Sequence, residues 1–145
     1  MFEYNPYKNV NINEVRRIKV VTDLWVYGPC PKKDDILKQE ITFYLDGRIK
    51  CKNFTYDKDG SEYHYANTET YEINQESFKD MAFRLDDCFK NNKLLYEIII
   101  ADVGTFNLAM YGAKGRKVFV YGGAMLGNEV LNILKDYYNL IHLCY

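Results

Sequence analysis

The feature that most constrains the fold is a repeated short loop that ends in glycine and separates stretches of alternating apolar residues. Four breaks have this form, namely Leu45-Asp46-Gly47, Lys58-Asp59-Gly60, Asp102-Val103-Gly104 and Ala113-Lys114-Gly115. A type I turn followed by a glycine in the left-handed region makes a three-residue β-hairpin loop. Because the loop length fixes the register of the flanking strands, each glycine predicts which residues face one another.

The first of these loops predicts a hairpin with one apolar side. With 45–47 as the loop, Phe43 faces Ile49 and Ile41 faces Cys51, and these residues share one side of the ribbon. The same rule, applied to the last two loops, also predicts apolar pairs. These are Ile100 with Phe106, Ile98 with Leu108, Tyr96 with Met110, Met110 with Val118, and Leu108 with Val120.

One alternating stretch precedes the hairpins, and one amphipathic stretch follows the first two loops and another follows the last two. Residues 15–27 alternate, with Ile18 and Val20 on one side and Arg17 and Lys19 on the other, as in a half-buried strand. A helix is expected over 75–90, because Asn74 is a good N-cap and apolar residues then recur at helical spacing. A second helix is expected over 128–138.

Together these elements predict one α+β domain over residues 14–145, after a flexible N-terminal arm over 1–13. The predicted fold is an antiparallel β-sheet of about six to seven strands with two helices packed on one face. After the leading strand, the elements follow one another as two β-β-β-α units, in which the second unit begins with a strand near 94–101.

Composition favours a protein of the cytoplasm without a cofactor. The 145 residues carry 19 basic and 20 acidic side chains, net charge −1, which is unlike a dedicated DNA-binding protein. No stretch looks like a signal peptide or a membrane span. Four scattered cysteines and two histidines form no metal-ligand spacing, so we expect reduced thiols and no metal site.

No motif of a known catalytic mechanism is present. The chain lacks GxSxG, and YGGAMLGNE fits neither phosphate-binding glycine pattern. The neighbouring carboxylates Asp86 and Asp87 are expected on the solvated outer side of the first helix. We therefore assign no catalytic residues, and an enzymatic activity is less expected than binding.

The segment EYHYANTETYEI, residues 62–73, breaks the alternation rule. Tyr63, Tyr65 and Tyr71 share a strand parity with Asn67 and Glu69, and the glycine rule places Tyr65 opposite Asn53 on the core side. A buried unpaired carboxylate is costly. Three interpretations stay open: a β-bulge near Asn67 that turns Glu69 outward, a shifted register that exposes the tyrosines, or a small-ligand pocket. The pocket would be lined by Asn53, Tyr65, Asn67, Glu69 and Tyr71.

The face of the sheet away from the helices is predicted to be basic and aromatic. Such faces suit protein partners and also single-stranded nucleic acid. The predicted partner-binding residues are Trp25, Tyr27, Tyr44, Arg48, Lys50, Lys52 and Phe54.

These observations predict a small accessory protein that acts by binding another protein. An immunity, inhibitor or anti-defence protein from a bacterium or phage would fit. The alternatives are a small-ligand binder or unclassified enzyme that uses the Glu69 region, and a nucleic-acid binder that uses the basic aromatic face. A homodimer through this face or a sheet edge is a further expectation.

Overall fold

The fold consists of one antiparallel sheet and two helices. The computed structural model describes Tyr7 and residues 9–23, 36–56, 63–91, 104–124 and 129–137. In chain order the elements are η1 (Ile12–Glu14), β1 (Arg17–Asp23), β2 (Ile36–Tyr44), β3 (Arg48–Tyr56), β4 (Tyr63–Glu72), α1 (Gln75–Lys90), β5 (Thr105–Tyr111), η2 (Ala113–Gly115), β6 (Lys117–Ala124) and α2 (Glu129–Tyr137).

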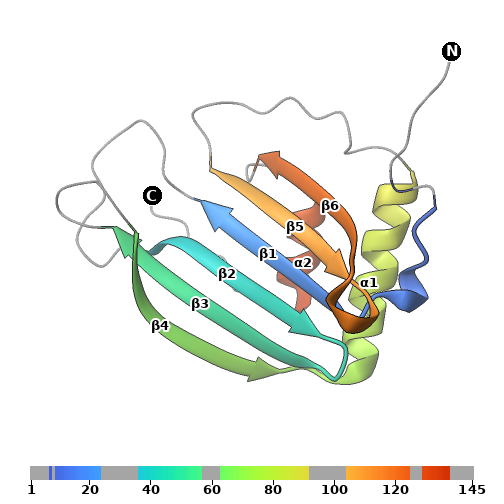
Figure 1. Cartoon of the computed structure of the whole chain (residues 1–145), viewed down its shortest axis with the longest axis horizontal. Coiled ribbons are helices and arrows are strands. Elements are labelled where there is room, and N and C mark those ends of the chain that lie inside the picture. The colour runs from blue at the N-terminus through green and yellow to red at the C-terminus, as the bar shows by residue number, and fades with distance from the viewer. Residues whose placement is uncertain are drawn as a thin grey trace, which may run out of the picture.

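The six strands form a single sheet in the order β4-β3-β2-β1-β5-β6, and every neighbouring pair is antiparallel. Both helices lie behind this sheet in Figure 1, so the predicted α+β class is confirmed. The first β-β-β-α unit is β2-β3-β4-α1. In the second unit β5 and β6 precede α2, and the strand predicted near 94–101 lies outside the described residues.

The register predicted for the first hairpin is confirmed. Phe43 pairs with Ile49 and Ile41 pairs with Cys51, and all four side chains are buried. The loop closes with a hydrogen bond from Gly47 N to Tyr44 O of 2.9 Å, and Gly47 has a φ of +97°. The loop also holds the connection between β4 and α1, because Ile73 N donates a hydrogen bond to Gly47 O at 2.7 Å.

The register predicted between β5 and β6 was wrong. The predicted partners Tyr96, Ile98 and Ile100 lie outside the described residues, and β5 pairs with β1 on one side and with β6 on the other. On the β6 side the partner of Met110 is Phe119 rather than Val118, and the partner of Leu108 is Tyr121 rather than Val120.

A bulge explains the shift by one residue. Tyr111 still pairs with Lys117, but the next partner of β5 is Phe119, so Val118 is the extra residue. The bulge turns the rings of Phe119 and Tyr121 into the core, where their centroids lie 4.9 and 5.2 Å from that of Phe89 on α1. The turn itself is tighter than predicted: Arg116 N donates to Ala113 O, and the two central residues Lys114 and Gly115 both have positive φ.

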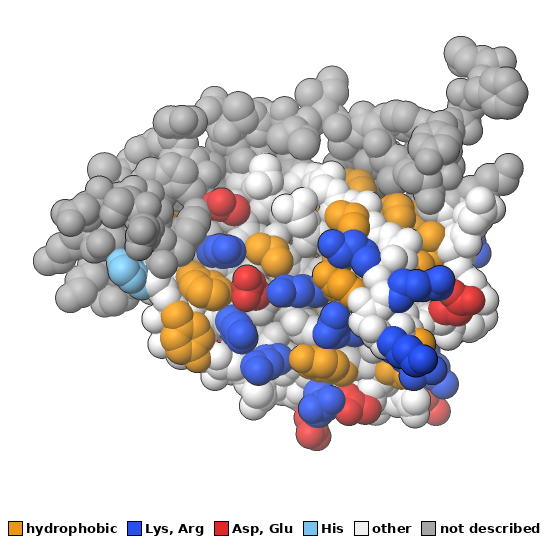
Figure 2. All heavy atoms as spheres, in the orientation of Figure 1, with side chains coloured by type: hydrophobic (Ala, Val, Ile, Leu, Met, Phe, Trp, Pro, Cys, Tyr) orange, Lys and Arg blue, Asp and Glu red, His pale blue; other side chains and the backbone are white. Residues whose placement is uncertain are grey.

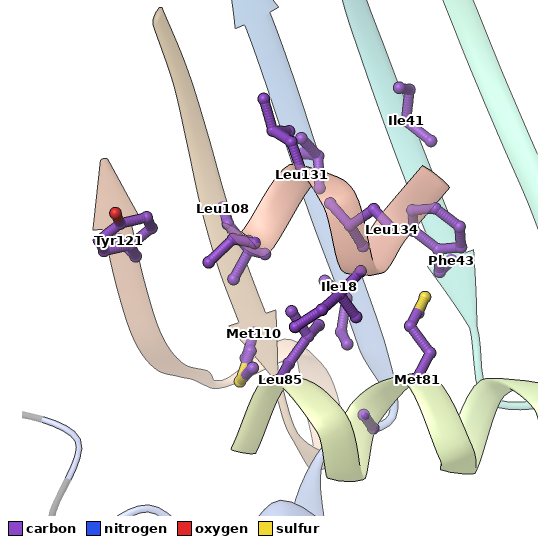
Figure 3. Packing of buried hydrophobic residues seen from close by; sticks show 14 of the residues in the cluster. Ile18, Ile41, Phe43, Met81, Leu85, Leu108, Met110, Tyr121, Leu131 and Leu134 are labelled. Atoms are coloured by element: carbon purple, nitrogen blue, oxygen red, sulfur yellow. The ribbon is translucent and has the colours of Figure 1, made fainter. Parts of the chain in front are cut away.

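The helices supply the other half of the core. Asn74 caps α1, since its side-chain oxygen accepts a hydrogen bond from Ser77 N at 2.6 Å, as the sequence predicted. In Figure 3 the apolar side chains of α1 and α2 point toward those of the central strands. The labelled residues of this cluster are Ile18, Ile41, Phe43, Met81, Leu85, Leu108, Met110, Tyr121, Leu131 and Leu134.

A residue from the segment before β1 is part of the core as well. Tyr7 is fully buried, and its hydroxyl donates to Asp86 Oδ1 at 2.8 Å. Burial, and then the hydrogen bond to the Asp86 carboxylate, raise the pKa of Tyr7 far above its ordinary value. The expectation that Asp86 is solvated was therefore wrong, because only 8% of it is exposed, whereas Asp87 is exposed.

Two glycines test the importance of the first hairpin loop. A Cβ on Gly47 would lie 1.8 Å from Ile73 O, whereas a Cβ on Gly115 would meet nothing within 4 Å, although φ is positive at both positions. We expect Gly115→Ala to lower the free energy of unfolding by about 1–2 kcal/mol, which is the strain of the left-handed backbone alone. Gly47→Ala should cost clearly more, about 3 kcal/mol or above, because the backbone of Ile73 must also move. Urea unfolding of the two variants measures the difference, and equal losses would contradict the close packing of the loop.

Candidate functional site

The face of the sheet opposite the helices is strongly basic. Figure 2 shows this face, with basic side chains gathered over the middle strands and hydrophobic side chains between them. Alternate residues of the strands point to it. Among the described strands, it carries the basic residues Arg17, Lys19, Lys38, Arg48, Lys50, Lys52 and Lys117 and the acidic residues Asp23, Glu40 and Glu72. We call this surface the open face.

The charge of the open face contrasts with that of the whole chain. Its seven basic and three acidic side chains give an excess of four positive charges, whereas the chain as a whole has a net charge of −1. The rest of the molecule is therefore acidic on balance. Such a division creates a local positive potential that a near-neutral total charge conceals.

One row of residues across the open face alternates cations and aromatic rings. The pairing of the strands aligns Lys117, Tyr111, Arg17 and Tyr44, and the first hairpin adds Arg48 beside Tyr44. The guanidinium carbon of Arg17 lies 4.3 Å from the ring centroid of Tyr111, and that of Arg48 lies 4.7 Å from the ring centroid of Tyr44. These contacts hold the cations at fixed places on the face.

In the next row a small residue lies between two lysines. Thr42 on β2 pairs with Lys19 on β1 and with Lys50 on β3. In the part of the chain that the structure describes, neither lysine, nor Lys52 on β3, has a carboxylate within 4 Å. Their charges are thus available to an anionic partner.

Arg48 differs because it already has a local partner. Its Nε lies 2.7 Å from Asp46 Oδ2, and both side chains are well exposed. The hydrogen bond from Arg48 N, and then the guanidinium, hold the pKa of the Asp46 carboxyl below its usual range. An exposed ion pair of this kind is weak, so a carboxylate of a partner can compete for Arg48.

The structure brings together most of the residues predicted for partner binding. Tyr44, Arg48, Lys50, Lys52 and Phe54 all lie on the open face. Trp25 and Tyr27 lie outside the described residues. Sequence reasoning missed Arg17, Lys19, Lys38, Tyr111 and Lys117, because their membership of this surface depends on the order of the strands. The only sequence signal was the alternation of β1, which sets Arg17 and Lys19 opposite Ile18.

The tyrosine-rich strand β4 contains the bulge that was one of the three interpretations. Asn53 pairs with Asn67 and Phe54 pairs with Tyr65, so Ala66 is the extra residue. The expected effect was wrong, however. Glu69 stays opposite Cys51 on the helix side, and it is Tyr65 that turns to the open face, where 59% of it is exposed. Its ring meets that of Phe54 at a centroid distance of 6.1 Å.

Hydrogen bonds connect the polar groups on the helix side of β2, β3 and β4. Gln39 Nε2 donates to Asn53 Oδ1 at 2.8 Å, and Asn53 Nδ2 donates to Asn67 Oδ1 at 2.8 Å. Gln39 and Asn53 are fully buried, so each amide satisfies the other. Of the predicted pocket residues, the structure joins Asn53 to Asn67 in this way.

The carboxylate of Glu69 is accommodated at the edge of the sheet. Tyr71 OH donates to Glu69 Oε2 at 2.5 Å, and β4 is an outermost strand of the described sheet. Glu69 is only half-buried there, and Tyr71 is exposed. The predicted pocket is thus divided into two hydrogen-bonded pairs, with its fifth member, Tyr65, on the opposite face.

Comparison of the sequence with protein-family models and with curated proteins gives no match. Within the described ranges, no helix is long and apolar enough to cross a membrane. Nor do three or more potential metal ligands come together among the residues that the structure describes.

The thiol of Cys51 reports whether the helix side of β3 is open to small molecules. Burial, and then the nearby charge of Glu69, raise the pKa of Cys51 to about 11. At pH 8 roughly one such thiol in a thousand is ionised. We expect iodoacetamide to leave Cys51 unmodified in the folded chain and to alkylate it in urea, as peptide mass mapping can show. Equal modification in both states would mean that this region opens to solutes.

Proposed function

We propose that this chain is a binding protein whose open face holds an acidic surface of a partner protein. The observation that carries the proposal is the excess of four positive charges on that face, together with lysines that lack a carboxylate partner in the described part of the chain. A complementary acidic surface would remove the repulsion between these cations and would be drawn to them at long range.

The open face is large enough for a macromolecule. Six strands at about 4.8 Å spacing and roughly 23 Å of strand length give a projected area of about 550 Å². One partner in a protein complex of standard size buries about 800 Å² of accessible surface, and side chains give the face more accessible surface than its projection. A small metabolite would use only a fraction of it.

The state of the aromatic rings favours a protein over single-stranded nucleic acid. Bases bind such faces by stacking on open rings. Here Arg48 lies over Tyr44, Arg17 lies over Tyr111, and Lys38 lies 5.4 Å from the ring centroid of Phe54. These three rings therefore support cations, whereas the ring of Tyr65 on the outermost strand is exposed. Guanidinium groups held in this way are suited to bidentate contacts with carboxylates.

The position of Glu40 supports the same choice. It lies in the middle of the face, opposite Lys52 on β3 and Val21 on β1. A continuous polyanion would have to pass this carboxylate, whereas a protein surface can set a donor against it. An inhibitor or immunity protein, which acts through one stable complex, fits such a surface.

Charge reversal on β3 tests the proposal. We expect Lys50→Glu/Lys52→Glu to weaken binding of the partner at least about tenfold, because each reversed charge turns an attraction into a repulsion. The control is Lys79→Glu/Lys114→Glu, which makes the same change of net charge at exposed positions outside the face. The partner is captured from a lysate of the native host, identified by mass spectrometry, purified, and titrated against the three proteins at two salt concentrations.

Three outcomes would contradict the proposal. The first is equal binding by the face variant and the control. The second is that single-stranded RNA or DNA binds the wild-type chain at low salt and no protein partner displaces it. The third is a concentration-dependent dimer that the β3 substitutions dissociate, because the face would then be occupied by a second copy of the chain.

A further inference from the structure

A hollow lies at the centre of the open face, over Thr42. Thr42 is short, and its neighbours across the sheet, Lys19 and Lys50, are long. Along β2 its neighbours on the same face are Glu40 and Tyr44. The long side chains form a rim around the short one, and the hollow that results encloses about 220 Å³.

The rim of the hollow concentrates positive charge. Arg17, Lys19, Lys50 and Lys52 line it, and the single carboxylate in the lining is that of Glu40. The backbones of Lys19 and Lys50 are two strand spacings apart, about 10 Å. Their flexible four-carbon stems allow both ammonium groups to reach a group that sits above Thr42. The Thr42 hydroxyl adds a donor at the floor.

Arg17 lines the hollow and has a donor that the described part of the chain leaves without an acceptor. Its Nε is the one buried side-chain nitrogen or oxygen among the described residues that has no hydrogen-bond partner. Its guanidinium rests on Tyr111, which holds the cation at the hollow. Buried polar groups without partners are rare in folded proteins and mark places where a partner is missing.

We propose that this hollow is an oxyanion seat, in which a carboxylate or phosphoryl group on a side chain of the partner protein is held by Arg17, Lys19 and Lys50. The inference rests on the proposed function and names the chemistry at its centre. An oxyanion above Thr42 neutralises the cations around the rim, accepts hydrogen bonds from the lysines, and offers Arg17 an acceptor. Glu40 at the far side sets the orientation, because it repels an anion and favours a donor group of the partner.

Small oxyanions serve as probes of the seat. Sodium phosphate and sodium glutarate are titrated separately into the ¹⁵N-labelled chain at constant ionic strength, and the backbone amide signals of Lys19, Thr42 and Lys50 are followed. We expect saturable shifts at these positions with at least one probe. Saturation by phosphate alone indicates a phosphoryl group in the partner, saturation by glutarate alone indicates a carboxylate, and saturation by both shows that the seat accepts either group.

Two variants and one control separate a seat from diffuse charge. Lys19→Gln should weaken probe binding about tenfold or more, because it removes a charge-assisted hydrogen bond. Thr42→Phe should abolish binding by filling the hollow, with its fold checked by the unchanged pattern of distant amide signals. Lys117→Gln removes the same charge from the same face but not from the hollow, and should leave probe binding within about twofold. Equal weakening by Lys117→Gln, or the absence of saturable shifts with both probes, would overturn the seat.

The partner protein distinguishes the failure of this inference from that of the proposed function. If the seat exists, Thr42→Phe also loses the partner. A wild-type chain that binds its acidic partner on the open face but neither probe refutes the seat alone. If the probes bind in the hollow but the affinity for the partner is unchanged by the β3 charge reversals, the proposed function alone is refuted.

Discussion

The two-residue period of side chains along β1 is the constraint on which both the core and the open face depend. Ile18 and Val20 are fully buried beneath the helices, and Arg17 and Lys19 project from the other side of the same seven-residue strand. β1 lies at the centre of the sheet and pairs with β2 and β5. Paired residues point to the same face, so the two faces of β1 continue into the neighbouring strands. A slip of one residue would bury two cations without partners and expose the core, at a cost far above the stability of a small domain. The basic face is therefore fixed by the same free energy that fixes the core.

Local turn chemistry predicted part of the register, and long-range packing decided the rest. The loop that ends at Gly47 aligns β2 with β3 as its sequence indicates. Bulges at Ala66 and Val118 then move the outer strands by one residue. The bulge at Val118 gains burial of Phe119 and Tyr121 against Phe89, which is about thirty residues away in sequence. A hairpin considered by itself does not contain that ring, so its sequence cannot indicate which register the helix will favour.

The same distinction separates the site residues that the sequence predicted from those it missed. Arg48, Lys50 and Lys52 belong to one hairpin, so alternation alone groups them. Arg17 and Lys19 join them only because β1 is inserted between β2 and β5, an arrangement that no local pattern specifies. Asp86 shows the same limit within a helix. Its helical position places it at the border of the apolar stripe, and its burial follows from a hydrogen bond to Tyr7, 79 residues earlier in the chain.

The distribution of ion pairs argues that the open face is completed by another molecule. Asp46 pairs with Arg48 beside the first hairpin loop, and three further ion pairs lie off the open face: Asp136 with Arg84 between the helices, Asp86 with Lys90 along α1, and Glu14 with Arg116 beside the last turn. These pairs lie away from the middle of the sheet, where Lys19, Lys50 and Lys52 have no carboxylate within 4 Å among the described residues. Lys50 and Lys52 are two residues apart on β3, and Lys19 lies across β2 from Lys50, so their like charges repel one another, and Glu40 alone does not balance them. Repulsion that the fold leaves in place lowers the stability of the isolated chain and is relieved when an anion arrives. The unmatched charges therefore supply both long-range attraction, screened beyond about 8–10 Å at ordinary salt, and part of the binding free energy.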